Sequence, residues 1–246
     1  MKQHEAVIKV MEDNGGYSTL GLLYQEVPKI KECVWRTKTT FASIRRIVQD
    51  GRFFFKIKPG LWALKSFKKS LPFDVLPAGK EARYKKEEFN HTYYQGLLVE
   101  IGNLKQLTTF IPNQDKNKPF LGKKLGEMTT LKEFYGFTYD HILRKARTID
   151  VTWFNQRKMP DQLFEVEHST DINNSLLKFV ELQDFKVKFR IVAHETREPE
   201  FKMKLNSDAF KPIKDRTFFL GYEKLSEWHT KTHEIIGIEG SLCVSI

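Results

Sequence analysis

Three acidic residues fall close together within residues 148–170. Asp150 opens one run in which apolar and polar residues alternate, and Glu165 and Glu167 lie in a second run of this kind. A polar stretch with a proline, residues 155–162, separates the two runs, which predicts two adjacent strands joined by a hairpin-like loop. Glu165 and Glu167 would then project from one face, roughly 7 Å apart along the strand. Asp150 can reach the same cluster from the neighbouring strand.

Three carboxylates gathered at one end of a sheet repel one another, and a hard cation that takes oxygen ligands removes that cost. We therefore predict a Mg²⁺ site formed by Asp150, Glu165 and Glu167. Acids that alternate with apolar residues also occur on any half-exposed strand, where each acid is simply solvated. A helix-start signal, residues 168–171, directly follows the second run. The acids thus lie at a strand end next to a loop, where functional sites are usually built, which favours the metal site.

The elements that would position these acids follow from hydrophobic periodicity over residues 91–246. Helical spacing marks 91–107, 173–185, 199–210 and 225–233, and a further helical segment is predicted within 130–146. Short strands are predicted near 108–111, 188–194 and 216–225, in addition to the two acidic strands. The strand at 188–194 is almost wholly apolar, as a central buried strand should be. This order predicts a three-layer α/β domain with a mixed central sheet.

Residues 1–70 predict a separate small domain. Helices are expected over 4–12, 20–26 and 41–50, and a β-hairpin is expected around Pro59-Gly60. Three helices and a hairpin predict a winged helix-turn-helix, in which the third helix enters the major groove and the hairpin forms the wing. The candidate DNA-binding residues are Lys38, Arg45, Arg46, Gln49, Lys56 and Lys58.

Charge supports a polyanionic partner for this N-terminal part. The chain has 246 residues and a net charge of +10, and residues 1–70 hold 14 Lys and Arg against 6 Asp and Glu. Winged helices also serve as protein-interaction modules, but the surplus of positive charge favours DNA. Residues 71–90 carry two prolines and a charge run and are interpreted as a partly ordered linker between domains 1–70 and 91–246, in which the charge run, residues 80–88, forms a solvated helical turn.

Cysteine usage and hydropathy indicate where the protein works. Cys33 and Cys243 form no C-x-x-C motif and no disulfide framework, which fits a reducing cytosol. The N-terminal stretch carries Glu5 and is not predicted to be a signal peptide, and no apolar run approaches the ~20 residues that span a bilayer. His229 and His233 are spaced i, i+4 as in a zinc pair, but no accompanying ligand motif supports one. We therefore expect a protein of the cytoplasm, with no membrane partner.

Two resemblances follow from these patterns. Residues 1–65, with the ending KIKPGLWALK, resemble the HARE-type winged helix of bacterial restriction enzymes and eukaryotic chromatin proteins. Residues 91–230, with Asp150 and the Glu165-x-Glu167 pair, resemble the PD-(D/E)XK nuclease superfamily of type II restriction endonuclease-like fold. The second resemblance implies that Asp150 and Glu165 are metal ligands. It also implies a helix acid near the metal, and Glu100 is the candidate.

Other residues of the implied site are less standard. Gln95 is a weaker candidate on the same predicted helix as Glu100. Glu167 stands where the superfamily usually has lysine, as in some restriction enzymes with E-x-E, and it would serve as a base, a second-metal ligand or both. Lys178 on the following helix supplies the missing positive charge, or else is an exposed helix lysine.

The resemblance implies a Mg²⁺-dependent double-stranded DNA endonuclease of restriction or defence type, using one or two ions, in a bacterial or archaeal cell. A homodimer is expected if both strands are cut, and sensing of modified bases is suggested by the pairing of the two domains. Two alternatives remain: a DNA-binding regulator whose nuclease-like domain is inactive, and a structure-selective repair nuclease.

Overall fold

The computed structural model describes residues 1–35, 39–72, 75–76 and 82–242, with the backbone alone for 82–86 and 241–242. The chain divides into two compact units, one formed by Met1–Gly79 with Ser226–Ile246 and the other by Lys80–Leu225. Both units mix helices with strands. Within the described residues, no helix combines the length and hydropathy needed to cross a lipid bilayer.

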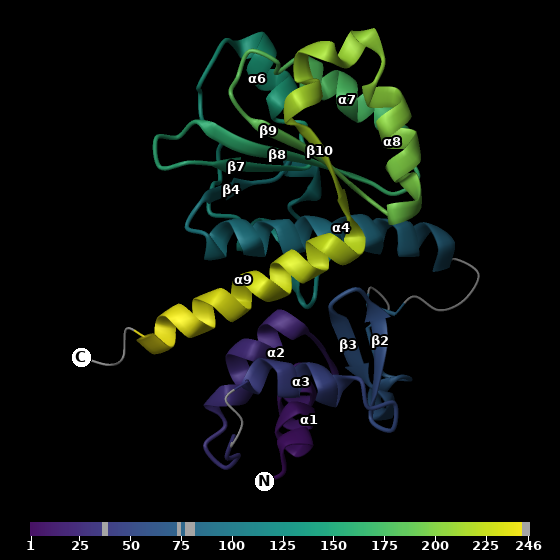
Figure 1. Cartoon of the computed structure of the whole chain (residues 1–246), viewed down its shortest axis with the longest axis vertical. Coiled ribbons are helices and arrows are strands. Elements are labelled where there is room, and N and C mark those ends of the chain that lie inside the picture. The colour runs from purple at the N-terminus through teal and green to yellow at the C-terminus, as the bar shows by residue number, and fades with distance from the viewer. Residues whose placement is uncertain (36–38, 73–74, 77–81, 243–246) are drawn as a thin grey trace. The chain divides into compact units, whose positions relative to one another are not determined.

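A five-stranded sheet with the order β10-β9-β8-β7-β4 forms the centre of the larger unit (Figure 1). β8, β9 and β10 run parallel, whereas β7 and β4 are antiparallel to their neighbours, so the mixed central sheet expected from the sequence is confirmed. The strand bounds are β4 Thr108–Phe110, β7 Val151–Phe154, β8 Pro160–Glu167, β9 Lys188–Ala193 and β10 Thr217–Gly221. The direction of pairing therefore changes at β8, the strand that carries the two glutamates.

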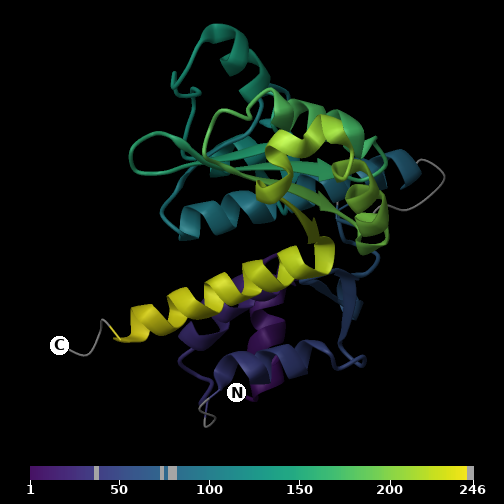
Figure 2. The same cartoon turned by 45° about the horizontal axis from the view of Figure 1, so that its top comes forward.

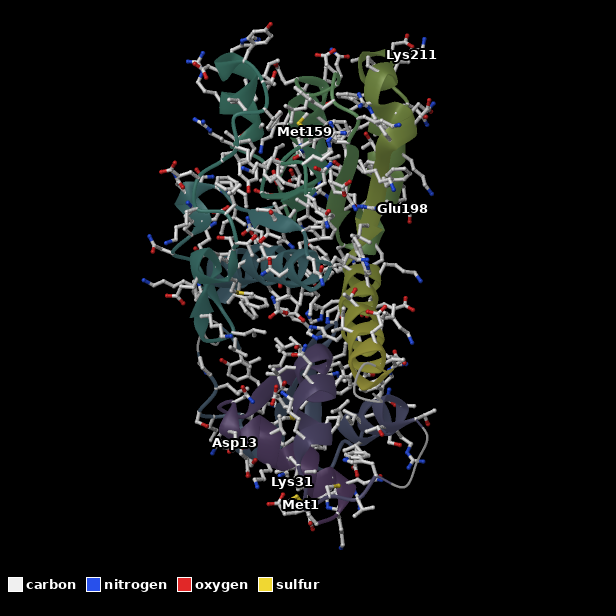
Figure 3. All side chains as sticks on the ribbon, turned by 90° about the vertical axis from the view of Figure 1, so that its left-hand side faces the viewer. Met1, Asp13, Lys31, Met159, Glu198 and Lys211 are labelled. Atoms are coloured by element: carbon white, nitrogen blue, oxygen red, sulfur yellow. The ribbon has the colours of Figure 1, made fainter. Side chains whose placement is uncertain are left out.

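Helices cover both faces of this sheet (Figures 1 and 2). On one face α7 (Ile172–Val180) and α8 (Glu198–Leu205) connect the parallel strands, as parallel pairing requires. On the other face lies α4 (Ala82–Leu104). The apolar side chains of α7 and α8 form one core with those of the sheet: Leu163, Leu176, Phe179, Phe189, Ile191, Phe201 and Leu205. Side chains fill the space between these layers in Figure 3, where Met159 labels the β7–β8 turn and Glu198 the start of α8.

Two glycines bring α4 close to the strands. A Cβ atom on Gly96 would lie 2.1 Å from the ring of Phe120, and one on Gly102 would lie 2.5 Å from Thr109 and 2.7 Å from Trp153. Trp153 of β7 also donates from its indole nitrogen to the carbonyl oxygen of Leu98, at 3.1 Å. α4 is therefore fixed against β7, the strand that begins just after Asp150.

The start of α4 differs from the sequence interpretation. The segment expected to be a linker, residues 71–90, includes the first turns of α4, because Ala82 already belongs to the helix. Residues 82–90 are rich in Lys, Glu and other good helix formers. The charge run is therefore the beginning of a long helix.

The connection between β4 and β7 also differs from expectation. The helix predicted within 130–146 covers only α6 (Asp140–Ala146). The preceding residues form a coil whose aromatic rings pack edge-on, with Phe134 and Phe154 at 5.1 Å between centroids. The packing of Phe134 on Phe154 of β7 thus outweighs the helical spacing of apolar residues in this segment. The connection also contains α5 (Leu125–Met128) and the short pair β5 (Pro119–Phe120) and β6 (Lys123–Lys124).

The smaller unit places three helices beside a three-stranded antiparallel sheet of order β1-β3-β2. The bounds are α1 Gln3–Asp13, β1 Tyr17–Thr19, α2 Leu20–Glu26, α3 Thr40–Val48, β2 Phe54–Lys58 and β3 Leu61–Leu64. β2 and β3 form the hairpin predicted around Pro59-Gly60, and β1 was not predicted. Thr19 begins α2 by accepting a hydrogen bond from the Leu22 amide at 3.2 Å. Residues such as Val7, Leu23, Ile44 and Phe54 form the core.

The C-terminal part of α9 (Tyr222–Leu242) completes this smaller unit. A Cβ atom on Gly21 of α2 would lie 2.3 Å from the ring of His233 and 2.7 Å from that of His229. The two histidines are thus buried where α9 and α2 approach closely. The predicted boundary at residue 70 left out this C-terminal segment, because contacts between the chain ends have no local sequence signal.

Candidate active site

The three acids predicted from the sequence lie together where β7 begins and β8 ends. Val151 pairs with Phe164 across the two strands, so Asp150, one residue earlier, comes beside Glu165. Glu167 is the last residue of β8 and pairs with Ala193 of the parallel strand β9. The acids therefore lie at the carboxyl end of a buried parallel strand, the usual position of a site in an open α/β sheet.

These acids line an open cavity of about 470 Å³. Its charged lining contains six carboxylates and two lysines: Glu87, Glu88, Asp150, Glu165, Glu167, Asp171, Lys118 and Lys178. His91, Ser175 and the loop that leads from β8 into α7 complete the lining. All of these residues belong to the larger unit.

Asp150 is held by two donors from different layers. One carboxylate oxygen, Oδ2, accepts a hydrogen bond from the Val166 amide at 2.7 Å and lies 3.2 Å from His91 Nε2. Burial lowers the pKa of His91, but the hydrogen bond and the negative charge of Asp150 outweigh burial, so the pKa is raised. The Asp150 carboxylate thus connects α4 to β8.

Glu165 is almost completely buried, with 2 % of its surface exposed. The ammonium of Lys178 lies 3.0 Å and 2.8 Å from its two carboxylate oxygens, and Ser175 Oγ lies 3.1 Å from one of them. Burial, followed by the charge of Asp150, raises the pKa of Glu165 well above its ordinary value, although Lys178 acts in the opposite direction. Lys178 therefore compensates only part of the cost of this buried charge.

Glu167 is also buried, and two hydroxyl groups contact its carboxylate. Ser175 and Thr170 each donate to one of its oxygens. Burial raises the pKa of Glu167, while the hydrogen bond from Ser175 lowers it. Because Ser175 contacts both glutamates, α7 fixes the relative orientation of their carboxylates.

The donor set is the kind that a small divalent cation prefers. Asp150, Glu165 and Glu167 offer carboxylate oxygens within one cavity, and burial raises the pKa of the two glutamates. Mg²⁺ is bound through one or two carboxylates together with water or substrate oxygens. These residues therefore fit a magnesium ion, and the open side of the cavity leaves room for an anionic substrate.

Four of the predicted site residues line the cavity, and Glu100 does not. Asp150, Glu165, Glu167 and Lys178 come together in the cavity. Glu100 does not line it: nine residues, about two and a half helical turns, separate it from His91, which places the two on opposite sides of α4. The α4 residue that reaches the acids is therefore His91.

Gln95 supports the site rather than lining it. Its amide nitrogen lies 3.3 Å from the carbonyl oxygen of Asp150 and 2.8 Å from the carboxylate of Asp115. His91 and Ser175 were missed in the sequence. His91 precedes Gln95 by one helical turn, and this spacing was the one available signal. Ser175 has no distinguishing local pattern.

The six DNA-binding candidates lie in the smaller unit and are not equivalent. The Arg45 side chain is held within this unit, because its Nε donates to the hydroxyl of Tyr24 at 3.2 Å and its guanidinium lies 3.8 Å from Glu234. Lys38 lies outside the described residues. The exposed candidates are Arg46, Gln49 and Lys56, and Lys58 is half-buried.

Comparison with known proteins places this chain in a family. Residues 74–242 match the model of the type II restriction enzyme NmeDI C-terminal domain, which covers more than half of the chain, and the chain belongs to this family. The type II restriction enzyme NmeDI of Neisseria meningitidis serogroup C is 27% identical over 139 residues. That match covers 52% of this chain and 39% of the relative, so the chain corresponds to about two fifths of that protein. No solved structure matches the chain significantly.

The buried charge of Glu165 predicts an effect on stability in the absence of metal. A group whose pKa is raised by folding stabilises the fold at pH values below its ordinary pKa, and this contribution is lost as the pH rises through the raised value. Glu165→Gln should therefore increase the free energy of unfolding at pH 7 in EDTA, measured by urea denaturation. Glu133→Gln makes the same chemical change on an exposed residue and should have no effect. A loss of stability in Glu165→Gln would contradict the electrostatic account.

Proposed function

We propose that this protein is a Mg²⁺-dependent endonuclease of restriction type that hydrolyses phosphodiester bonds in double-stranded DNA. One observation carries the proposal: Asp150, Glu165 and Glu167 lie together with Lys178 in one open cavity at the end of β8. Membership of the restriction-enzyme domain family supports the same reaction class. The cytoplasm of a bacterial or archaeal cell is the proposed location.

The order of the site residues supports a PD-(D/E)XK assignment. An acid precedes the first strand of a hairpin, an acidic pair ends the second strand, and a helix follows directly. Glu167 occupies the position where the superfamily usually has lysine. Lys178 reaches the acids from α7 and contacts Glu165 at 2.8 Å. We therefore propose that the lysine function has been transferred from β8 to α7.

The metal ligands in this proposal are Asp150, Glu165 and Glu167, which would hold one or two Mg²⁺ ions. Bound Mg²⁺ lowers the pKa of a coordinated water and stabilises the negative charge of the leaving oxygen. Lys178, 2.8 Å from Glu165, would offset part of the negative charge of this ligand. Glu100 is not part of this ligand set, because it faces away from the cavity.

The side chains of the site have separate roles in the proposed hydrolysis. Lys178 offsets negative charge that develops on the scissile phosphate. Glu167, whose pKa is raised by burial, accepts the proton of the attacking water. The water oxygen forms a bond to phosphorus as the bond to the leaving oxygen of the DNA strand breaks. Ser175, in contact with both glutamates, keeps their carboxylates aligned during this step.

For the smaller unit we propose a winged helix of HARE type that contributes to target recognition, with modified bases as one class of target. The order α1-β1-α2-α3-β2-β3 supports this assignment, with α3 as the groove-reading helix and β2–β3 as the wing. Arg46 and Gln49 of α3 and Lys56 of the wing are exposed. Arg45 is better explained as a link between α3 and the C-terminal part of α9, through Glu234. A homodimer is proposed, because two copies of the site would cut both strands of a duplex in one binding event.

The acid cluster predicts the loss of cleavage without the loss of DNA binding. Asp150→Ala, Glu165→Ala and Glu167→Ala should each reduce Mg²⁺-dependent cleavage by roughly 100-fold or more, because each removes a group that stabilises the transition state. Binding of duplex DNA by the full chain, measured by fluorescence anisotropy, should remain. Digestion of genomic DNAs that carry different methylation patterns provides the activity assay.

Two outcomes of that assay would count against the proposal. Cleavage that persists in all three variants would reject these residues as the site. A wild-type protein that binds duplex DNA and cleaves none of the substrates would support a DNA-binding regulator instead. Glu133→Gln, an exposed acid outside the cavity, serves as the matched control and should cleave as the wild type does.

The winged-helix assignment of the smaller unit predicts an effect on the affinity for DNA and on its dependence on salt. Arg46→Ala should weaken duplex binding by the full chain at all sequences and reduce the slope of log affinity against log salt by about 1, as expected for a lost phosphate contact. Lys29→Ala removes a surface lysine outside α3 and the wing, on the turn after α2, and should change neither quantity. An Arg46→Ala variant with unchanged affinity and slope would argue for a protein-interaction role of this unit.

A further inference from the structure

A second lysine of the cavity has no role in the chemistry described above. Lys118 lines the cavity together with His91 and Asp150, and 28% of its side chain is exposed. It follows the short helical turn η3 (Asn113–Asp115), which connects β4 to β5. Sequence analysis gave no reason to select it, because it is one of several lysines in a polar loop.

A buried acid holds this lysine in place. Asp115 has 2% of its surface exposed, and its Oδ1 lies 2.7 Å from the Lys118 ammonium. The Lys118 amide donates to the carbonyl oxygen of Asp115 at 3.0 Å, and the Lys118 carbonyl accepts from the Leu125 amide at 3.0 Å. Both the main chain and the side chain of Lys118 are therefore fixed.

The same acid connects Lys118 to the carboxylate cluster. The other oxygen of Asp115 accepts a hydrogen bond from Gln95, which is completely buried, at 2.8 Å. Gln95 lies 3.3 Å from the carbonyl oxygen of Asp150, and His91, one helical turn earlier, contacts the Asp150 carboxylate. The position of the Lys118 ammonium is thus set relative to Asp150 by a continuous series of contacts.

The two lysines of the cavity differ in how many acceptors they meet. Lys178 contacts both oxygens of Glu165 and lies 3.4 Å from the carbonyl oxygen of Thr148. Among the described residues, Asp115 is the only side chain that pairs with the Lys118 ammonium. An ammonium group has three donors, so Lys118 keeps donors for a further acceptor.

The substrate of the proposed reaction needs such a donor. Six carboxylates line the cavity and repel a phosphodiester that approaches it. We propose that Lys118 is a substrate-binding residue that donates to a non-bridging oxygen of a DNA phosphate at, or next to, the bond that is cut, with Asp115 and Gln95 as the residues that position it. This inference rests on the proposed nuclease function and extends it to a residue outside the metal-binding cluster.

A purely structural role for the Asp115–Lys118 pair makes a different prediction. Removing Lys118 alone leaves a buried carboxylate without its partner, which destabilises the fold whatever the role of the lysine. The double variant Asp115→Asn/Lys118→Met removes both charges and relieves this effect. A structural pair would recover stability and activity together in the double variant, whereas a phosphate-binding lysine would recover stability alone.

The experiment measures kcat/KM for cleavage of duplex DNA in Mg²⁺ by the full chain. Lys118→Met and the double variant should each lose about 10- to 100-fold, the range expected for a hydrogen bond to a charged group. Lys118→Arg should retain most of the activity. Lys116→Met is the matched control, because Lys116 lies on the same loop, donates to the Lys132 carbonyl at 2.8 Å and does not line the cavity. This variant should cleave as the wild type does.

A second measurement identifies the contacted phosphate. Once the position of wild-type cleavage has been mapped, duplexes with a single uncharged methylphosphonate are made at each phosphate near the cut. Neutralising the contacted phosphate should slow the wild type about as much as Lys118→Met does, and should slow the double variant no further.

The outcomes separate this inference from the function on which it rests. A wild type that cleaves, together with a double variant that is equally active, would overturn the role of Lys118 and leave the nuclease assignment intact. The same conclusion follows if every methylphosphonate slows the wild type and the double variant equally. A wild type that cleaves no DNA would overturn both proposals.

Discussion

The repulsion between carboxylates at the end of β8 is the constraint on which the larger unit depends. Glu165 and Glu167 are buried beside Asp150, and among the described residues the basic groups that contact the three acids are Lys178, at Glu165, and His91, at Asp150. Burial raises the pKa of both glutamates, so ionising them in the folded protein is unfavourable without a compensating charge. We propose that a divalent cation, which these oxygens fit, supplies the compensating charge.

The layers on either side of the sheet hold the acids in place through different contacts. α7 supplies Ser175 and Lys178 to the glutamates. α4 supplies His91 to Asp150, and the close approach of Gly102 to β7 fixes the distance between helix and strand. In the proposed function, the negative charge of the DNA is compensated separately, by lysines of the cavity and by basic residues of the smaller unit. Neutralising the metal-binding acids and neutralising the basic residues should therefore produce different defects, one in chemistry and the other in DNA affinity.

Sequence reasoning found the parts of the site that depend on strand periodicity. Alternation placed Glu165 and Glu167 on one face, and the hairpin brought Asp150 beside them. The sequence did not show which side of α4 faces the acids. Glu100 was predicted to lie near the metal, but it faces away from the cavity, and His91 is the α4 residue that contacts Asp150. Contacts between distant segments could not be predicted, because they have no local sequence pattern. Arg45 contacts Glu234, and residues 226–242 belong to the N-terminal unit, although these segments lie almost two hundred residues apart in the sequence.

Locating a bound cation tests the central claim most directly. Crystals of the full chain grown with Mn²⁺, which stands in for Mg²⁺ and scatters anomalously, would show where the ion binds. The account predicts an anomalous peak between Asp150 and Glu165, about 2 Å from a carboxylate oxygen of each, and no such peak in Asp150→Ala. Crystals in which Mn²⁺ is absent from this cavity, with the three carboxylates still in their present positions, would contradict it.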